Sequence, residues 1–130
     1  MDTKFRAWHF GLKRMFSAEE MTEDQMALLP DGHFANIDAD DTRLSKIYSH
    51  EEMLPLQFTG LLDKTNKEIY EGDVLQYDRD ARLEYPKTMI FEDGRFVLKG
   101  TDERRRWDIT GYSEYTVIGN VYENPELVAP

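Results

Sequence analysis

The acidic side chains are the first residues whose type and spacing could do chemistry. Asp38, Asp40 and Asp41 place carboxylates as the first positions of a calcium loop do. The position that requires glycine in such a loop is Arg43, and the twelfth position is Ser49 instead of glutamate. The pattern therefore predicts an acidic turn and no metal site.

Histidine and cysteine usage gives no further metal chemistry. His9, His33 and His50 show neither a helical pair spacing nor the carboxylate pattern of a zinc hydrolase. The chain has no cysteine, which excludes thiolate ligands, disulfides and a cysteine nucleophile. We expect no metal and no cofactor.

Enzyme chemistry finds little support in the remaining polar residues. Glu71 and Asp73 could pair as acid and base, but acids at a strand entry more often stabilise a turn. No serine has a nucleophile-elbow context, and no glycine-rich phosphate loop is present. The sequence predicts a protein without catalytic activity.

One run of the chain is strongly basic. It comprises Arg104, Arg105, Arg106 and Trp107. Three cations beside an aromatic ring could hold a phosphate and stack a base. Three acids flank the run and nearly cancel its charge: Asp102, Glu103 and Asp108. Nucleic-acid contact at this run is the alternative hypothesis, against a solvated edge whose Trp107 packs inward.

Size and charge limit the remaining possibilities. A chain of 130 residues with 40% hydrophobic content fits one domain, 1–130, with a hairpin and acidic excursion in 1–52 and a β core in 53–125. Residues 17–52 hold ten acidic and two basic side chains, the largest share of the net charge of −10. That field repels nucleic acid and favours a basic partner. Without a signal peptide or a membrane-length apolar run, we expect a cytoplasmic protein with no membrane contact.

The N-terminal elements are read from short patterns. Residues 4–16 alternate polar and apolar side chains in two runs, which predicts a hairpin. Ser17 with Glu20, and Thr22 with Gln25, have capping-box spacing in front of the apolar residues 26–29, which Pro30 terminates. This pattern predicts a short acidic helix there. No element is assigned to the residues that follow, as far as Tyr48.

Short strands separated by turns follow from Leu54, the pattern of a small sandwich or barrel. The expected strands are 56–59, 69–70, 74–77, 88–91, 96–98 and 115–122. Gly60 should end the first, and Asp93-Gly94 supplies the positive φ angles of a tight hairpin between the fourth and fifth. The last strand should be buried on both faces, because β-branched and aromatic residues fill it. A tail is expected over 126–130.

Three segments carry a family resemblance: KFRAWHFGLKRMF from Lys4, LQFTGLLDKTNKEIYEGDVLQY from Leu56, and YTVIGNVYENPEL from Tyr115. Together they resemble the YopX-like family of phage and prophage proteins. The resemblance implies a mainly β fold, a small SH3-like barrel or roll with an N-terminal hairpin and a short acidic helix. It implies no activity. His9 stands where the family more usually has aspartate.

The resulting hypothesis is a non-catalytic phage accessory protein that binds other proteins. The expected partners are a second copy of the chain, forming a homo-oligomer, and a host or phage protein, through the acidic residues 17–52. The nominated binding residues lie in the family-like segments: Trp8, Tyr70, Glu71, Asp73, Tyr122, Glu123 and Asn124. The three aromatic residues among them fit a core equally well, and Asn124 before Pro125 is also an expected turn former. The alternative is a nucleic-acid-associated factor built on an SH3-like barrel.

Overall fold

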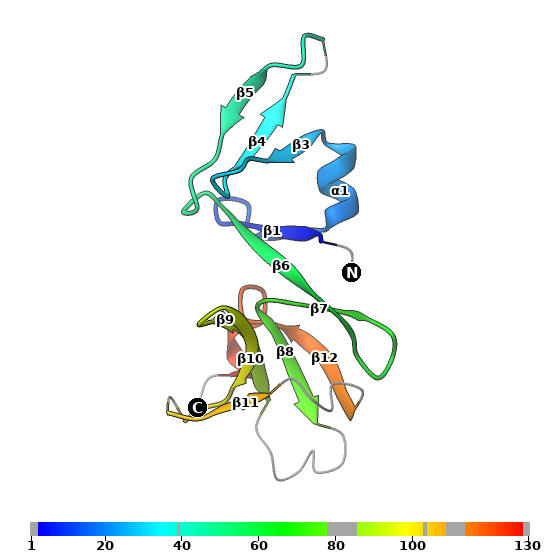
Figure 1. Cartoon of the computed structure of the whole chain (residues 1–130), viewed down its shortest axis with the longest axis vertical. Coiled ribbons are helices and arrows are strands. Elements are labelled where there is room, and N and C mark those ends of the chain that lie inside the picture. The colour runs from blue at the N-terminus through cyan, green and yellow to red at the C-terminus, as the bar shows by residue number, and fades with distance from the viewer. Residues whose placement is uncertain (1–2, 39, 78–85, 103, 109–113, 129–130) are drawn as a thin grey trace. The chain divides into compact units, whose positions relative to one another are not determined.

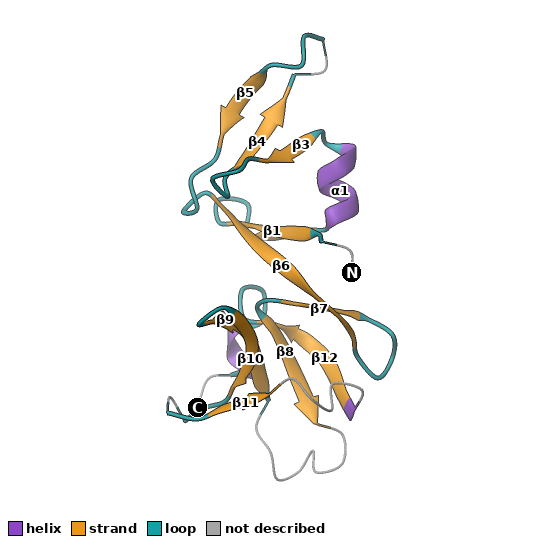
Figure 2. Cartoon of the chain, viewed as in Figure 1, coloured by secondary structure: helices purple, strands orange, loops and turns teal. Residues whose placement is uncertain are grey.

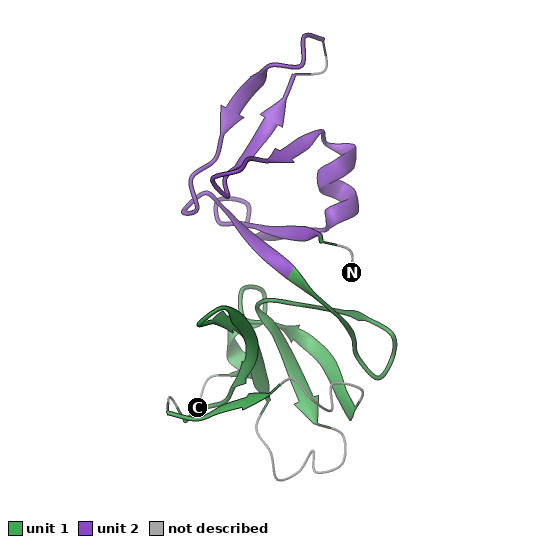
Figure 3. Cartoon of the chain, viewed as in Figure 1, with its two compact units in different colours: residues 1–3, 58–130 green, residues 4–57 purple. Residues whose placement is uncertain are grey.

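The computed structural model describes residues 3–38, 40–77, 86–102, 104–108 and 114–128. Strands make up 51% of the structure and helices 9%, and the curled sheets form a half-barrel (Figures 1 and 2). The predicted mainly β fold with a small barrel or roll is therefore confirmed. The chain divides into two compact units, an N-terminal unit of residues 4–57 and a C-terminal unit of residues 58–130 with 1–3 (Figure 3).

The N-terminal unit begins with the predicted hairpin and helix. Strands β1 (Phe5–His9) and β2 (Arg14–Phe16) pair antiparallel, and the first half of β6 (Met53–Leu62) pairs with β1 on its other side. Helix α1 (Ala18–Glu23) follows. The Glu20 N–H donates to Ser17 Oγ at 3.1 Å and the Ser17 N–H donates to Glu20 Oε1 at 3.2 Å, so the capping box is confirmed.

The apolar residues before Pro30 were expected in the short helix, but the helix ends at Glu23 and these residues form a strand instead. Met26–Leu28 is β3, which pairs with β4 (Phe34–Ile37), and β4 pairs with β5 (Leu44–Ile47) in a three-stranded sheet. Gln25, with φ 54°, turns the chain out of the helical path. Phe34 lies in the core of the unit, and Leu28, its register partner, packs against that core. A run of three apolar residues is too short to show which period it follows.

The C-terminal unit is built on a five-stranded antiparallel sheet with the order β11-β10-β9-β8-β12. Its strands are β8 (Asp73–Tyr77), β9 (Lys87–Glu92), β10 (Arg95–Lys99), β11 (Arg106–Asp108) and β12 (Tyr115–Asn120). The second half of β6 pairs with β7 (Glu68–Tyr70). The predicted hairpin between β9 and β10 is confirmed, because Asp93 and Gly94 have φ angles of 53° and 80° and join the paired residues Glu92 and Arg95.

The two faces of this sheet have different roles. Buried side chains of one face form the core cluster of the unit with Ile69: Leu75, Met89, Leu98, Tyr115 and Val117. The register places Thr88, Ile90, Val97 and Lys99 on the opposite face, because Thr88 pairs with Lys99 and Ile90 with Val97. We call this second surface the cleft face.

Three expectations about this unit need correction. Strand β6 does not end at Gly60 but continues to Leu62, and Gly60, with φ 87°, lies in an irregular stretch of the pairing with β7. Strand β12 is not buried on both faces, since a bulge between Val117 and Gly119 leaves Ile118 40% exposed. The expected tail begins instead with a 3-10 helix, η2 (Pro125–Leu127), while residues 129–130 lie outside the described residues.

Candidate functional site

Tyr70, Glu71 and Asp73 form the corner between β7 and β8. The backbone N–H of Tyr70 donates to Asp73 Oδ2 at 2.7 Å, and Asp73 is only 1% exposed. Gly72 between them has φ 91°, a conformation that glycine adopts without strain. The Tyr70 ring is buried against Phe58, with ring centroids 5.4 Å apart, while Glu71 is half-buried. The Asp73 carboxylate therefore stabilises the corner from within.

Tyr122, Glu123 and Asn124 form a second turn, which Asn120 organises. Asn120 Oδ1 accepts hydrogen bonds from the N–H groups of Tyr122 and Glu123, and its amide nitrogen donates to Glu123 Oε1 at 2.9 Å. Asn124 Oδ1 accepts from the Asn120 N–H at 3.2 Å. Tyr122 and Asn124 are half-buried and Glu123 is exposed. The turn thus uses the N–H groups of Tyr122 and Glu123 and the side chains of Glu123 and Asn124.

Trp8, the remaining nominated residue, belongs to the N-terminal unit. It lies on β1, is 6% exposed and meets Phe10 edge-on at 6.4 Å between ring centroids. The nominated residues therefore fall on three features, a corner, a turn and a buried strand position. Their role in partner binding stays a prediction.

The basic run has partners within the chain. Arg106 binds both oxygens of Glu92, at 2.9 Å and 3.1 Å. The Arg105 guanidinium lies over the Trp107 ring at 5.0 Å, and Arg104 is 3.8 Å from Asp102. The hydrogen bond from Arg106 holds the pKa of Glu92 below its ordinary value, and the charges of Lys99 and Arg95 act in the same direction. Glu103, which flanks the run, lies outside the described residues.

The acids and histidines considered as metal ligands do not gather into one group in the described part of the chain. Asp38 accepts the N–H of Asp40, and Asp41 accepts the N–H of Arg43, as expected of a turn. No group of three or more potential ligands gathers among the residues that the structure describes. The rings of His33 and His50 stack at 4.4 Å between ring centroids.

No helix in the described ranges is long and apolar enough to cross a membrane.

Asp63 is a buried polar centre of the C-terminal unit. Its Oδ1 accepts the N–H of Thr65 at 2.7 Å and of Lys67 at 2.9 Å, and its Oδ2 accepts the N–H of Val117 at 2.9 Å. Burial by itself raises the pKa of Asp63, but these hydrogen bonds outweigh it and hold the pKa below its ordinary value. The carboxylate ties the β6–β7 turn to β12.

Among the described strands, β5 is an open edge with exposed apolar side chains. All four of its residues are exposed, Leu44 by 47% and Ile47 by 55%. Ile47 pairs with Ala35 and Leu44 with Ile37, so both lie on the same face of the sheet. The pairing shifts register between them, which places the two apolar residues three apart. The strand was not recognised in the sequence because of this spacing. In a regular strand, two apolar residues on the same face are two or four positions apart.

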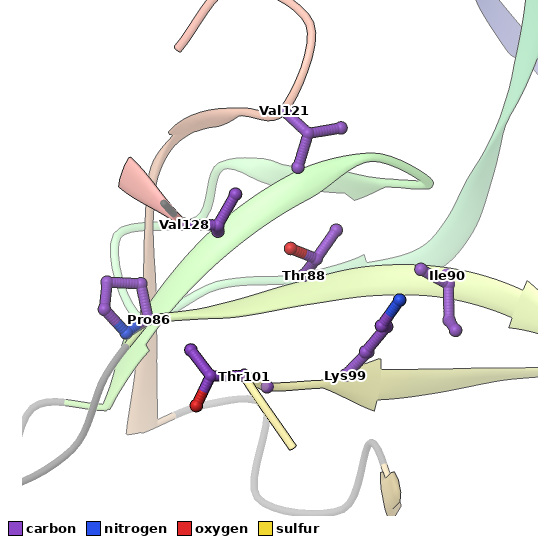
Figure 4. A pocket seen from close by; sticks show the side chains of 8 residues that line it. Pro86, Thr88, Ile90, Lys99, Thr101, Val121 and Val128 are labelled. Carbon is purple, nitrogen blue, oxygen red and sulfur yellow. The ribbon is translucent and has the colours of Figure 1, made fainter. Parts of the chain in front are cut away.

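A cleft of about 470 Å³ opens on the cleft face of the C-terminal unit. Thr88 and Ile90 of β9 line it together with Lys99 of β10, while Val121 and Val128 contribute from the segment after β12 (Figure 4). Its volume falls within the range of small-molecule sites. The β9–β10 hairpin was predicted, but the approach of Val128 to it was not.

The architecture defines a class of small, mainly β proteins with two compact units. The family model described as YopX protein matches residues 4–129, so the chain belongs to the YopX family. Among curated proteins no match is found.

Two solved structures are similar over nearly their whole length. Protein EF1440 from Enterococcus faecalis has 27% sequence identity and a TM-score of 0.67, with 99% of each chain covered. Protein yopX from Bacillus subtilis has 19% identity and a TM-score of 0.67, with 100% of this chain and 98% of that chain covered. The second likeness shows the fold alone. The names of both proteins state no function.

Proposed function

We propose that the protein is a non-catalytic protein-binding module of phages and prophages, which takes up an extended segment of a basic host or phage protein along β5. One observation carries the proposal. In the described part of the chain β5 has a sheet neighbour, β4, on one side only, and its side chains are all exposed. An open edge can add a strand from a partner by main-chain hydrogen bonds.

The side chains next to this edge supply apolar contact. Ala27, Ala35 and Ile47 are opposite one another across the three strands, and Ile37 and Leu44 form the next row on the same face. The core of the N-terminal unit is formed on the other face, where Phe34 lies. A bound strand would therefore cover Leu44 and Ile47, which are otherwise left in water.

Charge selects the partner. Asp38, Asp40 and Asp41 lie in the β4–β5 turn, and residues 17–52 as a whole have a net charge of −8. A second copy brings the same acidic stretch to the same edge and is repelled, whereas a basic segment is attracted. We therefore infer a basic partner in place of self-association at β5.

Ile47→Lys should remove the interaction, because it replaces an apolar contact by a charge that repels a basic partner. Tagged protein is used to recover partners from host cells carrying the active phage, with and without nuclease. We expect a protein that wild type retains after nuclease treatment, and at least about tenfold less of it with Ile47→Lys, a loss of about 1.4 kcal/mol. Leu12→Lys is the matched control, since Leu12 is 63% exposed in the same unit but lies outside β5.

Three results would contradict the proposal. The first is equal recovery with Ile47→Lys and wild type. The second is recovery that disappears with nuclease, which would favour nucleic-acid contact at Arg104–Trp107. The third is a concentration-dependent dimer, seen by light scattering, that Ile47→Lys abolishes, because the occupant of β5 would then be a second copy.

A further inference from the structure

We propose that the N-terminal unit binds a small organic cation with an apolar body, in a pocket of about 390 Å³ that Asp24 and Asn36 line together with aromatic rings and methionines. All the lining residues fall within 4–57, so the pocket belongs to this unit alone (Figure 3). Its volume falls within the range of small-molecule sites. The inference is separate from the protein-binding proposal, because the lining residues come from outside β5.

Two polar side chains come together at this pocket. Gln25 turns the chain after α1, and its carbonyl accepts the Ile37 N–H at 3.0 Å. The register then pairs Met26 with Asn36. The segment that carries Asp24 therefore runs into the strand beside Asn36, and both side chains line the pocket. Carboxylate and amide oxygens accept hydrogen bonds, so they can hold a group that donates them.

The charge around the pocket favours a cation. Arg14 and Lys46 lie over rings that line it, and carboxylates neutralise both, because Arg14 pairs with Glu20 and Lys46 pairs with Glu52. Asp24 is an exposed acid whose carboxylate has no partner in the described part of the chain. It also belongs to the acidic stretch that has a net charge of −8. An ammonium or guanidinium group would balance the charge of Asp24.

The remaining lining suits an apolar body. The centroid of the His9 ring lies 6.2 Å from that of Phe16 and 6.3 Å from that of Tyr48, so three rings gather on one side. Met21 and Met53, which are 5% and 4% exposed, line the pocket from the core of the unit. Aromatic faces attract cations, and thioethers pack adaptably against rings. The lining therefore combines one charged group with a soft apolar interior.

The depth of these side chains sets the orientation of the ligand. Asp24 is exposed and Asn36 is half-buried, whereas Met21 and Met53 are buried. The charged end of the ligand therefore stays near water beside Asp24, and its apolar body displaces water from the interior. An ion pair that is exposed in this way adds only a modest part of the affinity, about threefold to fivefold.

The test uses phenethylammonium as the probe and the full chain labelled with ¹⁵N. Backbone amide shifts are followed by NMR during titration. We expect saturable shifts confined to the N-terminal unit, around residues 9–16, 21–26 and 48–53. Phenethyl alcohol has the same body without the charge and should bind at least about threefold more weakly. Phenylpropionate, which has the opposite charge, should bind more weakly still.

Asp24→Asn keeps the shape of the side chain and removes its charge. It should weaken phenethylammonium at least about threefold while leaving phenethyl alcohol binding unchanged. Glu19→Gln is the matched control, because Glu19 is an exposed acid of α1 outside the lining, and it should bind the probe as wild type does. Asn36→Ala removes the second acceptor and should weaken phenethylammonium and phenethyl alcohol alike, since both donate hydrogen bonds.

Certain outcomes would overturn the inference. Shifts that grow linearly without saturating, or that spread over both units, would show non-specific association. Equal phenethylammonium affinity in Asp24→Asn and wild type would remove the role of the carboxylate. Phenethyl alcohol or phenylpropionate that binds as tightly as phenethylammonium would show that the pocket does not select a cation.

Discussion

Asp63→Ala is expected to lower the free energy of unfolding by about 3 kcal/mol, the loss that follows when buried donors are left without an acceptor. The carboxylate receives hydrogen bonds from Thr65 and Lys67, and from Val117 on a strand 54 positions away. In the variant, the N–H groups of the exposed residues Thr65 and Lys67 can donate hydrogen bonds to water instead. The N–H of the buried residue Val117 cannot. The total free energy of unfolding of a small domain is only about 5–15 kcal/mol. Urea unfolding followed by circular dichroism measures the change.

Asp63→Asn separates the charge from the shape. The asparagine amide has one oxygen in place of two, so its NH₂ group must face either the Val117 N–H or the N–H groups of the turn. One of these donors then loses its acceptor, and we expect about 2 kcal/mol of destabilisation. Asp93→Asn is the control, because Asp93 is an exposed acid in the β9–β10 turn and its change should have little effect. If the Asp63→Asn variant is as stable as wild type, the carboxylate does not stabilise the turn.

The contribution of Asp63 should depend on pH. Its pKa in the folded protein lies below its value in the unfolded chain, which is about 3.9. The stabilisation is therefore complete above the unfolded pKa and is lost as the pH falls from there through the folded pKa. The stability difference between wild type and Asp63→Asn should be constant from about pH 7 to 5 and shrink below about pH 4. A difference that grows on acidification would contradict the assignment.

Gly119→Val is expected to cost about 3 kcal/mol through overpacking. A Cβ on Gly119 would lie 2.5 Å from Asn124 Oδ1 and 2.8 Å from Leu127 Cδ1, both closer than real Cβ contacts. The oxygen cannot retreat freely, because it accepts the Asn120 N–H. The variant should therefore push η2 away from β12. Urea unfolding gives the loss, and amide exchange over residues 119–127 shows whether it is local.

Gly94→Ala is the control for backbone strain. Gly94 has φ 80°, and nothing lies within 4 Å of the position that a Cβ would take, so only the left-handed backbone opposes a side chain, at about 1 kcal/mol. A cost for Gly119→Val no greater than for Gly94→Ala would show that η2 is not packed closely on β12.

The elements that could be predicted from the sequence depend on residues close together in the chain. Asp93-Gly94 predicted the β9–β10 hairpin, and Ser17 with Glu20 predicted the start of α1, because each signal acts through hydrogen bonds or φ angles within four residues. The three family-like segments pointed to the mainly β fold through the family resemblance that they carry. The YopX resemblance was confirmed over residues 4–129.

The aromatic residues nominated for binding show where residue type is insufficient. Trp8 and Tyr70 are buried, while Tyr122 is half-buried beside an exposed Glu123. An aromatic side chain fits a core and an interface for the same reason, its large apolar surface. Only the tertiary packing of each unit shows whether such a side chain lies in the core or at the surface.

The sequence by itself determined the class of fold, the turns, the acidic character of residues 17–52 and the family. The tertiary structure alone decided that Met26–Leu28 is a strand, that β5 is an open edge among the described strands and that Val128 and Lys99 line the same cleft. The reason is physical. Turns and caps are stabilised within a few residues, whereas strand register, edges and clefts depend on contacts between distant segments, and those form only when a whole sheet assembles.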